Sequence, residues 1–271
     1  MPKRITLAEP VWRTSVGVHS GQAITLGLHP AAAGSGLHLR RSDLGREWPV
    51  NPETAFVGPG CTAVGDPDHH VLFLEHLLAA LAAAGITDLL IEVNGPEIPL
   101  FEGGALALWA MICAAQTKEL DAEITPLVLP QAVIQGDVDH FLGAIPNETP
   151  ACFYFFASNH PLIGCQWASY RLGQDDFAAE LAPARTFITA DQAQAARQAG
   201  MLAGGSEDNA LVIYPDRLSA TPALPQAFAR HKLLDLVGDL YLLGRPVLAH
   251  IVGSRTGHRH NQELVRMLSD R

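Results

Sequence analysis

Residues 228–243 read Phe-Ala-Arg-His-Lys-Leu-Leu-Asp-Leu-Val-Gly-Asp-Leu-Tyr-Leu-Leu and are followed by Gly244. This largely apolar run predicts a helix, and the glycine is a suitable place for the helix to end. Residues four apart project from the same face of a helix, so His231, Asp235 and Asp239 lie one above another. An imidazole and a carboxylate that project together form half of a zinc or iron site.

Two shorter motifs can complete such a site. Glu75-His76 lies in a second apolar run, residues 71–84, which ends at Gly85 and also predicts a helix. Thr256-Gly257-His258 stands near the C-terminus. Two histidines and one aspartate around a metal leave a position open for water, as catalytic zinc requires. A His-x-x-x-Asp pair alone is common, so the inference depends on the three motifs together.

The order of the predicted elements repeats itself along the chain. Each half has strands, a helix with a candidate ligand, a glycine, a strand and a final helix. The sequence therefore predicts two α+β halves of related topology, residues 1–124 and 125–271, with the metal site at their interface. The predicted strands are 24–28, 37–40, 89–93, 127–134, 141–145, 152–157, 210–214 and 247–252, and the predicted helices are 71–84, 105–115, 191–199, 228–243 and 262–268.

Composition and charge exclude several classes of protein. The formal net charge of −10 and the absence of a basic patch argue against a nucleic-acid binder. The longest apolar runs, such as residues 77–85, are far shorter than the roughly 20 residues of a membrane span. The N-terminus has no apolar signal segment. We therefore expect a soluble, cytoplasmic protein whose four cysteines, none in a Cys-x-x-Cys pair, are buried thiols.

Seven ordered segments resemble the zinc-dependent UDP-3-O-acyl-N-acetylglucosamine deacetylases of lipid A biosynthesis. The resemblance spans nearly the whole chain, and so many ordered matches make chance an unlikely cause. It implies an α+β fold of two similar domains, each a small sheet packed against two helices, with the helices sandwiched between the sheets. The segments are Ser15–Gly21, Leu74–Leu81, Val93–Pro99, Ala184–Phe187, Gly204–Ala210, Arg230–Asp239 and Gly257-His258.

The resemblance also implies a role for individual residues. It assigns three zinc ligands, His76, His231 and Asp235, and it makes Glu75 the general base. The further implied catalytic groups are His258 as electrostatic partner and general acid, Thr186 as a hydroxyl that binds the oxyanion, and Asp239 as the carboxylate that holds the catalytic histidine. The implied substrate contacts are Lys232, Phe187, Gly205 and Arg255. Lys232 is expected on a different helix face from the ligands, and Gly205 belongs to an insert that lines an acyl-chain passage. The charge of Arg255 suits a phosphate.

The implied activity is the zinc-dependent removal of the N-acetyl group from UDP-3-O-acyl-N-acetylglucosamine, which releases acetate. Iron(II) could occupy the same ligand set as zinc. The expected partner is a small acylated nucleotide sugar, and we expect a monomer without nucleic acid or a membrane span.

Two departures from the family pattern leave alternatives open. Phe73 stands where the family has threonine, and Gly104 stands where it has serine. They are compatible with a paralogous zinc amidase that acts on another N-acyl compound. A non-catalytic nucleotide-sugar binding protein of the same fold is a second alternative, although it has no chemical need for the full set of catalytic groups. His19 is either near the site or part of a structural turn, and the sequence leaves open whether Cys61 approaches the metal.

Overall fold

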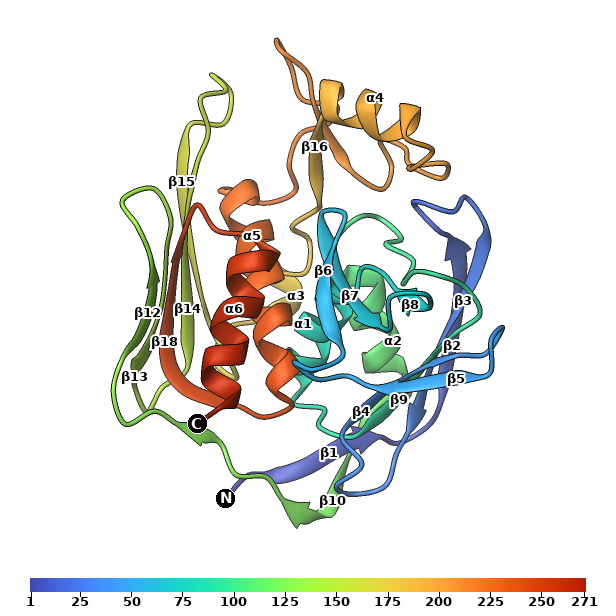
Figure 1. Ribbon diagram of the computed structural model, residues 1–271, viewed down its shortest axis with the longest axis vertical. Coiled ribbons are helices and arrows are strands. Elements are labelled where there is room, and N and C mark those ends of the chain that lie inside the picture. The colour runs from blue at the N-terminus through green and yellow to red at the C-terminus, as the bar shows by residue number, and fades with distance from the viewer.

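The computed structural model describes residues 1–271, and it places helices between two β-sheets (Figure 1). The first sheet has five strands in the order β2-β3-β9-β4-β5. The helices of this half are α1 and α2. The element bounds are β2 Val11–Val16, β3 Ala23–Pro30, β4 Leu37–Arg41, β5 Arg46–Pro49, β9 Leu89–Val93, α1 Glu75–Ala84 and α2 Leu106–Ala115.

The second sheet repeats this arrangement in the order β12-β13-β18-β14-β15, with β11 added in parallel beside β18. In each sheet the central strand follows the ligand-bearing helix, and it runs antiparallel to one neighbour and parallel to the other. The bounds are β11 Leu127–Val128, β12 Val133–Gly136, β13 Phe141–Pro146, β14 Ala151–Ala157, β15 Cys165–Arg171, β18 Val247–Ser254, α5 Ala227–Leu240 and α6 His258–Ser269.

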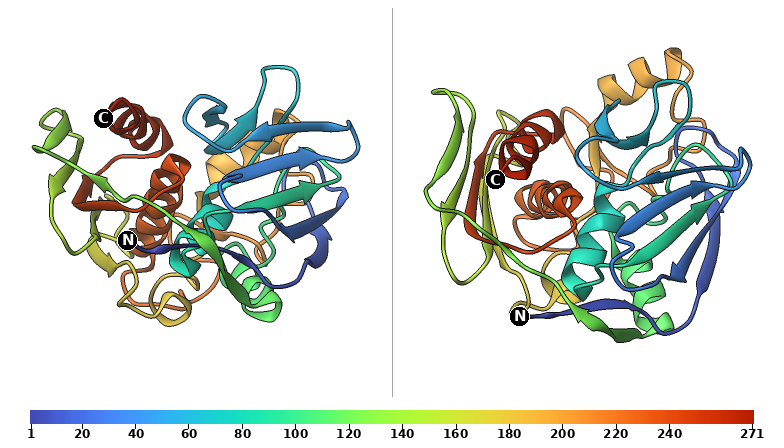
Figure 2. Two further views of the ribbon diagram at one scale, coloured as in Figure 1. Left: turned by 90° about the horizontal axis from the view of Figure 1, so that it is seen from below. Right: turned by 60° about the horizontal axis from the view of Figure 1, so that its bottom comes forward.

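Helices α1, α5 and α6 lie between the inner faces of the two sheets, as Figure 2 shows from two directions. A single cluster of 55 buried hydrophobic side chains extends through both halves, so the core is continuous across their interface. The predicted α+β class, with related sheets and sandwiched helices, is confirmed. No strand pair of the two large sheets crosses residue 125. The separation of the two sheets supports a domain boundary near residue 125. The boundary itself stays a prediction.

Smaller elements join or extend the two halves. β1 (Lys3–Leu7) pairs with β10 (Thr117–Glu123) across one end of the molecule, where both termini lie (Figure 1). A small unit with α4 (Ala190–Gln198) projects at the opposite end. The remaining elements are β6 Ala55–Gly58, β7 Cys61–Gly65, β8 His70–Val71, α3 Phe177–Glu180, β16 Phe187–Thr189, β17 Leu211–Ile213 and the 3-10 helix η1 Tyr241–Leu243.

Three sequence-based boundaries were wrong. The helix predicted from residue 71 begins at Glu75, because Val71 belongs to β8 and Phe73 has a left-handed φ of 65°. The strand predicted over 127–134 is divided into β11 and β12 by a segment that contains Pro130. The last helix begins at His258 instead of residue 262.

Two further expectations concern cysteines and membrane spans. Cys61 and Cys152 are buried as predicted, whereas Cys113 and Cys165 are exposed, so the prediction of four buried thiols was wrong. Cys113 lies on the outer face of α2, and Cys165 lies at the start of an edge strand. None of the helices combines the length and apolar composition needed to cross a bilayer.

Candidate active site

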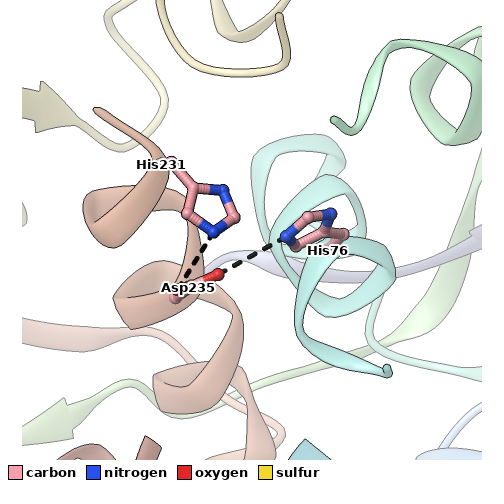
Figure 3. A group of neighbouring side chains, drawn as sticks. All are labelled: His76, His231 and Asp235. Atoms are coloured by element: carbon pink, nitrogen blue, oxygen red, sulfur yellow. Dashed lines mark ion pairs between the residues drawn. The ribbon is translucent and has the colours of Figure 1, made fainter. Parts of the chain in front are cut away.

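Three predicted ligands meet where α1 packs against α5. His76 lies in the first turn of α1, and His231 and Asp235 lie one turn apart on α5 (Figure 3). Their ligand atoms all lie within 4.8 Å of one another, and all three residues are buried. The Asp235 carboxylate is 3.4 Å from His76 Nε2 and 3.5 Å from His231 Nε2. The two halves of the chain thus bring one donor cluster together.

The chemistry of this cluster fits a divalent metal ion. Asp235 Oδ1 is buried and has no hydrogen-bond partner, which is costly unless another group satisfies it. Burial lowers the pKa of His231 to about 3, so its imidazole is neutral and can donate a lone pair. His76 Nδ1 lies 3.2 Å from the Gly104 carbonyl, which orients the ring so that Nε2 faces the cluster.

Lys232 reaches the same cluster. Its Nζ lies 2.5 Å from Asp235 Oδ2, three residues further along the helix. Burial opposes the charge of Asp235, but the positive charges of Lys232 and His258 outweigh burial and help to hold the pKa of this carboxyl well below its usual range. The expectation that Lys232 points to a different face was therefore wrong, since its flexible side chain folds back over the i, i+3 spacing.

Glu75 is the first residue of α1 and is almost completely buried. Its Oε2 accepts a hydrogen bond from the Thr62 backbone N–H at 2.9 Å. Burial raises the pKa of Glu75, and the nearby imidazoles of His258 and His76 oppose that rise. A buried carboxylate with a raised pKa beside a metal-ligand cluster is suited to accept and return a proton.

His258 begins α6 and faces the cluster from the other side. Its Nδ1 lies 2.9 Å from Asp239 Oδ2, and its Nε2 lies 3.8 Å from Asp235 Oδ2. Burial lowers the pKa of His258, but the carboxylates of Asp239 and Asp235 outweigh this effect and raise it to about 9. This imidazole therefore carries a positive charge at neutral pH.

Three polar residues around Asp239 escaped the sequence analysis. Thr62 Oγ1 donates to Asp239 Oδ1 at 2.5 Å, and Asn261 Nδ2 donates to Asp239 Oδ2 at 2.8 Å. Gln262 Nε2 in turn donates to Thr62 Oγ1 at 3.0 Å. Thr62 therefore links the carboxylate of Asp239 to that of Glu75. No local spacing could have revealed this, because residues 62 and 239 are 177 positions apart.

A pocket of about 100 Å³ opens onto these groups. Its lining includes Thr186, Phe187 and Phe73, together with Glu75, His76, His231, Lys232, Asp235 and His258. The Phe187 ring packs edge-on against His231, with ring centroids 5.3 Å apart. Gly205 and Arg255 lie outside this lining: Gly205 is in the loop after α4, and the exposed Arg255 guanidinium is 3.7 Å from Asp139. Their substrate contacts stay predictions.

The turn that contains His19 is held beside the site by a buried carboxylate. Glu97 accepts hydrogen bonds from the backbone N–H groups of His19 and Ser20 at 2.9 and 2.8 Å. The His19 ring packs on Phe73, with centroids 4.8 Å apart. On its other side, the turn accepts backbone hydrogen bonds from Ala203 and Gly204 of the projecting unit. His19 thus lies next to the pocket, in a turn that connects the residues around Phe73 with the loop after α4.

Comparisons with known proteins agree with this arrangement. The profile of a family described as UDP-3-O-acyl N-acetylglycosamine deacetylase matches residues 4–270. A UDP-3-O-acyl-N-acetylglucosamine deacetylase of Synechocystis sp. is 37% identical over 270 residues, which is 98% of each chain. Proteins with the same description from Leptospira biflexa and Myxococcus xanthus are 34% and 37% identical, over 98% of this chain and 89% and 86% of theirs.

Proposed function

The chain belongs to the family of UDP-3-O-acyl-N-acetylglucosamine deacetylases, and from this premise we propose that it hydrolyses the N-acetyl group of that substrate. The products are acetate and the free amine, in lipid A biosynthesis. The observation that carries the proposal is the arrangement of a metal-ligand cluster, a buried carboxylate and a charged imidazole around one pocket. Amide hydrolysis requires these functions together.

We propose zinc as the metal that His76, His231 and Asp235 hold. When bound, zinc acts as a Lewis acid and lowers the pKa of a coordinated water to about 7. Two imidazoles and one carboxylate suit zinc and also iron(II). The contact of His76 with the Gly104 carbonyl fixes the ring before the metal arrives, which lowers the entropic cost of binding.

Glu75 is the proposed carrier of the proton. In the first step, its carboxylate removes a proton from the attacking water, and the oxygen forms a bond to the acetyl carbon. In the second step, the C–N bond breaks and the same proton passes from Glu75 to the leaving nitrogen, so we assign this proton transfer to Glu75 in place of the general-acid role that the resemblance implies for His258. The raised pKa of this buried carboxyl suits it to both steps.

The acetyl oxygen gains negative charge between these steps. The charged imidazole of His258 and the hydroxyl of Thr186 line the pocket and are the proposed groups that stabilise this charge. Asp239 keeps the imidazole charged and oriented through the contact at Nδ1. Such preorganised groups require no rearrangement when the charge develops.

We propose that Lys232, Phe187, Gly205 and Arg255 contact the substrate. Lys232 and Phe187 line the pocket and supply a cation and an apolar ring. Gly205 lies on the projecting unit, and Arg255 offers a charge for a phosphate. The proposal includes a cytoplasmic location and a monomeric chain, which cell fractionation and light scattering would test.

The alternative of another N-acyl substrate now depends on Phe73. A Cβ at Gly104 would lie 2.6 Å from the Ala182 carbonyl oxygen, so a serine there would require the backbone to shift. The departure at residue 104 therefore has a local steric reason. Phe73, in contrast, lines the pocket with a bulky ring and favours a change in what the pocket accepts.

A turnover assay tests the proposal directly. Purified protein is loaded with one equivalent of zinc or, without oxygen, of iron(II), and acetate release from UDP-3-O-acyl-N-acetylglucosamine is measured. We expect turnover that a chelator abolishes and added metal restores. A protein that retains zinc but releases no acetate would favour the paralogue with another N-acyl substrate. A protein that binds no metal would favour the non-catalytic alternative.

A further inference from the structure

A cavity of about 350 Å³ lies between the two halves, away from the candidate active site. Its walls include Ala83 near the end of α1, and Val237 and Leu240 near the end of α5. A helix rises about 1.5 Å per residue, which puts Ala83 roughly 10 Å along α1 from His76. The cavity is within the roughly 300–1,000 Å³ range of small-molecule sites, and its mainly hydrophobic walls suit an apolar ligand.

The two charged residues that line this cavity have the same sign. Lys3 and Arg245 line it, and no aspartate or glutamate does, although acidic residues outnumber basic ones by 28 to 18 in the chain. Several arginines have carboxylate partners, such as Arg4 with Asp88 at 3.0 Å, whereas Arg245 takes part in no ion pair or side-chain hydrogen bond. A half-buried guanidinium without a partner is a ready site for an anion.

Lys3 is also available to an incoming anion. Its only ion pair is with Asp121 at 3.4 Å, and the Asp121 side chain is fully exposed. Surface pairs of this kind contribute little, so the ammonium can exchange this partner. Pro2, Lys3 and Gly173 are exposed where they line the cavity, so it opens to solvent beside the cation.

We propose that this cavity binds a single-chain anionic amphiphile. The hydrocarbon chain lies among Ala83, Val237 and Leu240, and Lys3 and Arg245 bind the carboxylate or phosphate head group. Burial of the chain supplies the free energy of binding, and the two cations select the charge of the head group. The proposal concerns a second site and does not depend on deacetylase activity.

Calorimetric titration of the full chain tests it with three ligands of one chain length. Dodecanoate and dodecyl phosphate carry anionic head groups, and their relative affinity separates a carboxylate site from a phosphate site. We expect one-to-one binding of at least one of them. Dodecyltrimethylammonium should bind at least about tenfold more weakly. Equal binding of the cationic ligand, or no binding of either anion, would overturn the proposal.

Matched variants locate the bound ligand. Ala83→Phe fills the cavity and should weaken binding of the preferred anion at least about tenfold, and Arg245→Gln should weaken it about five- to tenfold. Lys118→Gln removes the same charge from an exposed position on β10 outside the cavity and should leave binding unchanged. If both cavity variants bind the anion as tightly as the wild type, the amphiphile binds at another site, such as the catalytic pocket, and the proposal is overturned.

The two proposals can fail separately. Ala83 and Arg245 lie outside the catalytic pocket, so acetate release by both variants should equal that of the wild type. The far-ultraviolet circular dichroism of each variant verifies its folding even if the protein has no deacetylase activity. If Ala83→Phe does not fold, the affinity of Arg245→Gln for the anion still tests whether Arg245 contacts the head group.

Discussion

Glu75 and His76 are neighbours in the sequence but have different tasks in the proposed site. Glu75 Oε2 is held by the Thr62 N–H, and His76 belongs to the ligand cluster. Glu75→Gln keeps the shape of the side chain but removes the base. We expect it to retain the metal and to lower kcat about 10²- to 10⁴-fold, the usual contribution of a general acid–base group. Metal analysis and acetate release on the same sample provide the measurement.

His231→Ala removes one of three ligand atoms, so we expect loss of metal and of activity together. His250→Ala is the matched control, because His250 is half-buried on β18 and belongs to no ligand cluster. It should leave the metal content and the rate unchanged. Stoichiometric metal in His231→Ala would contradict the ligand assignment, and an unchanged rate in Glu75→Gln would contradict the role of the base.

Thr62 is expected to act as a positioning residue through Asp239. Its hydroxyl donates to Asp239 Oδ1 and accepts from Gln262 Nε2, and Thr62→Val removes both hydrogen bonds without changing the shape. We predict that kcat falls about tenfold, because loss of these bonds weakens the orientation of His258, while KM and metal content stay the same. Steady-state kinetics of the metal-loaded variant provide the measurement.

Thr62→Ser is the control for this prediction. It restores the hydroxyl, so it should recover most of the rate that Thr62→Val loses. A purely structural role would lower the unfolding midpoint and the content of active protein while the kcat per metal ion stayed constant. That result would contradict the positioning role.

At the scale of elements, the close approach of α1 and α5 brings the ligands together. Gly238 on α5 lies against the Glu75 backbone, and a Cβ there would be 1.9 Å from the Glu75 carbonyl oxygen. Glycine to alanine inside a helix normally stabilises by about 1 kcal/mol. Here we predict the opposite sign for Gly238→Ala: destabilisation of about 2 kcal/mol, because neither backbone can move aside easily. Urea unfolding measures the difference.

Gly257→Ala is the matched control for this substitution. Its added Cβ meets nothing within 4 Å, and its φ of −154° is ordinary extended backbone. Because Gly257 is the N-cap of α6, where alanine is less favourable than glycine, the substitution should lower the unfolding free energy by no more than about 1 kcal/mol. An increase in stability on Gly238→Ala would show that the helices can separate without cost, contrary to the packing described above.

Sequence patterns predicted the elements of this fold better than their ends. The run from Val71 to Ala84 is apolar except for Glu75 and His76, so periodicity could not show that a strand and a turn precede α1. The turn depends on the left-handed φ of Phe73, a conformation that a bulky residue rarely adopts and that no local pattern signals. Tertiary contacts of Phe73 with His19 accompany this conformation.

At the scale of the whole molecule, the repeated order of elements was enough to predict two related halves with helices between the sheets. The candidate ligand residues could be located because they belong to short motifs in two largely apolar runs that fold as helices. The groups around Asp239 were not, because Thr62, Asn261 and Gln262 come from different halves and meet only after folding. The cavity at the far end of α1 and α5 likewise depends on how the halves pack.

The same packing places a buried ion pair under β1. Asp88 is fully buried, and it accepts hydrogen bonds from Arg4 Nη1 at 3.0 Å, the Gly36 N–H at 2.9 Å and the Thr87 hydroxyl at 2.6 Å. Burial opposes its charge, but these donors outweigh burial and lower the pKa of Asp88. The ionised carboxylate therefore joins the N-terminal strand to the first half of the molecule.

This lowered pKa determines how stability depends on pH. Folding favours the ionised form, so the stabilisation is complete above the unfolded-state pKa of about 3.9 and is lost as the pH falls through the lower folded-state pKa. We predict that Asp88→Asn lowers the unfolding free energy by about 3 kcal/mol at pH 7, and that the difference from the wild type decreases in acid. Urea midpoints at pH 7, 4 and 2 measure it. Asp121→Asn, which changes a fully exposed carboxylate, should follow the wild type throughout. A deficit for Asp88→Asn that persists unchanged in strong acid would show that Asp88 stabilises through packing and not through its charge.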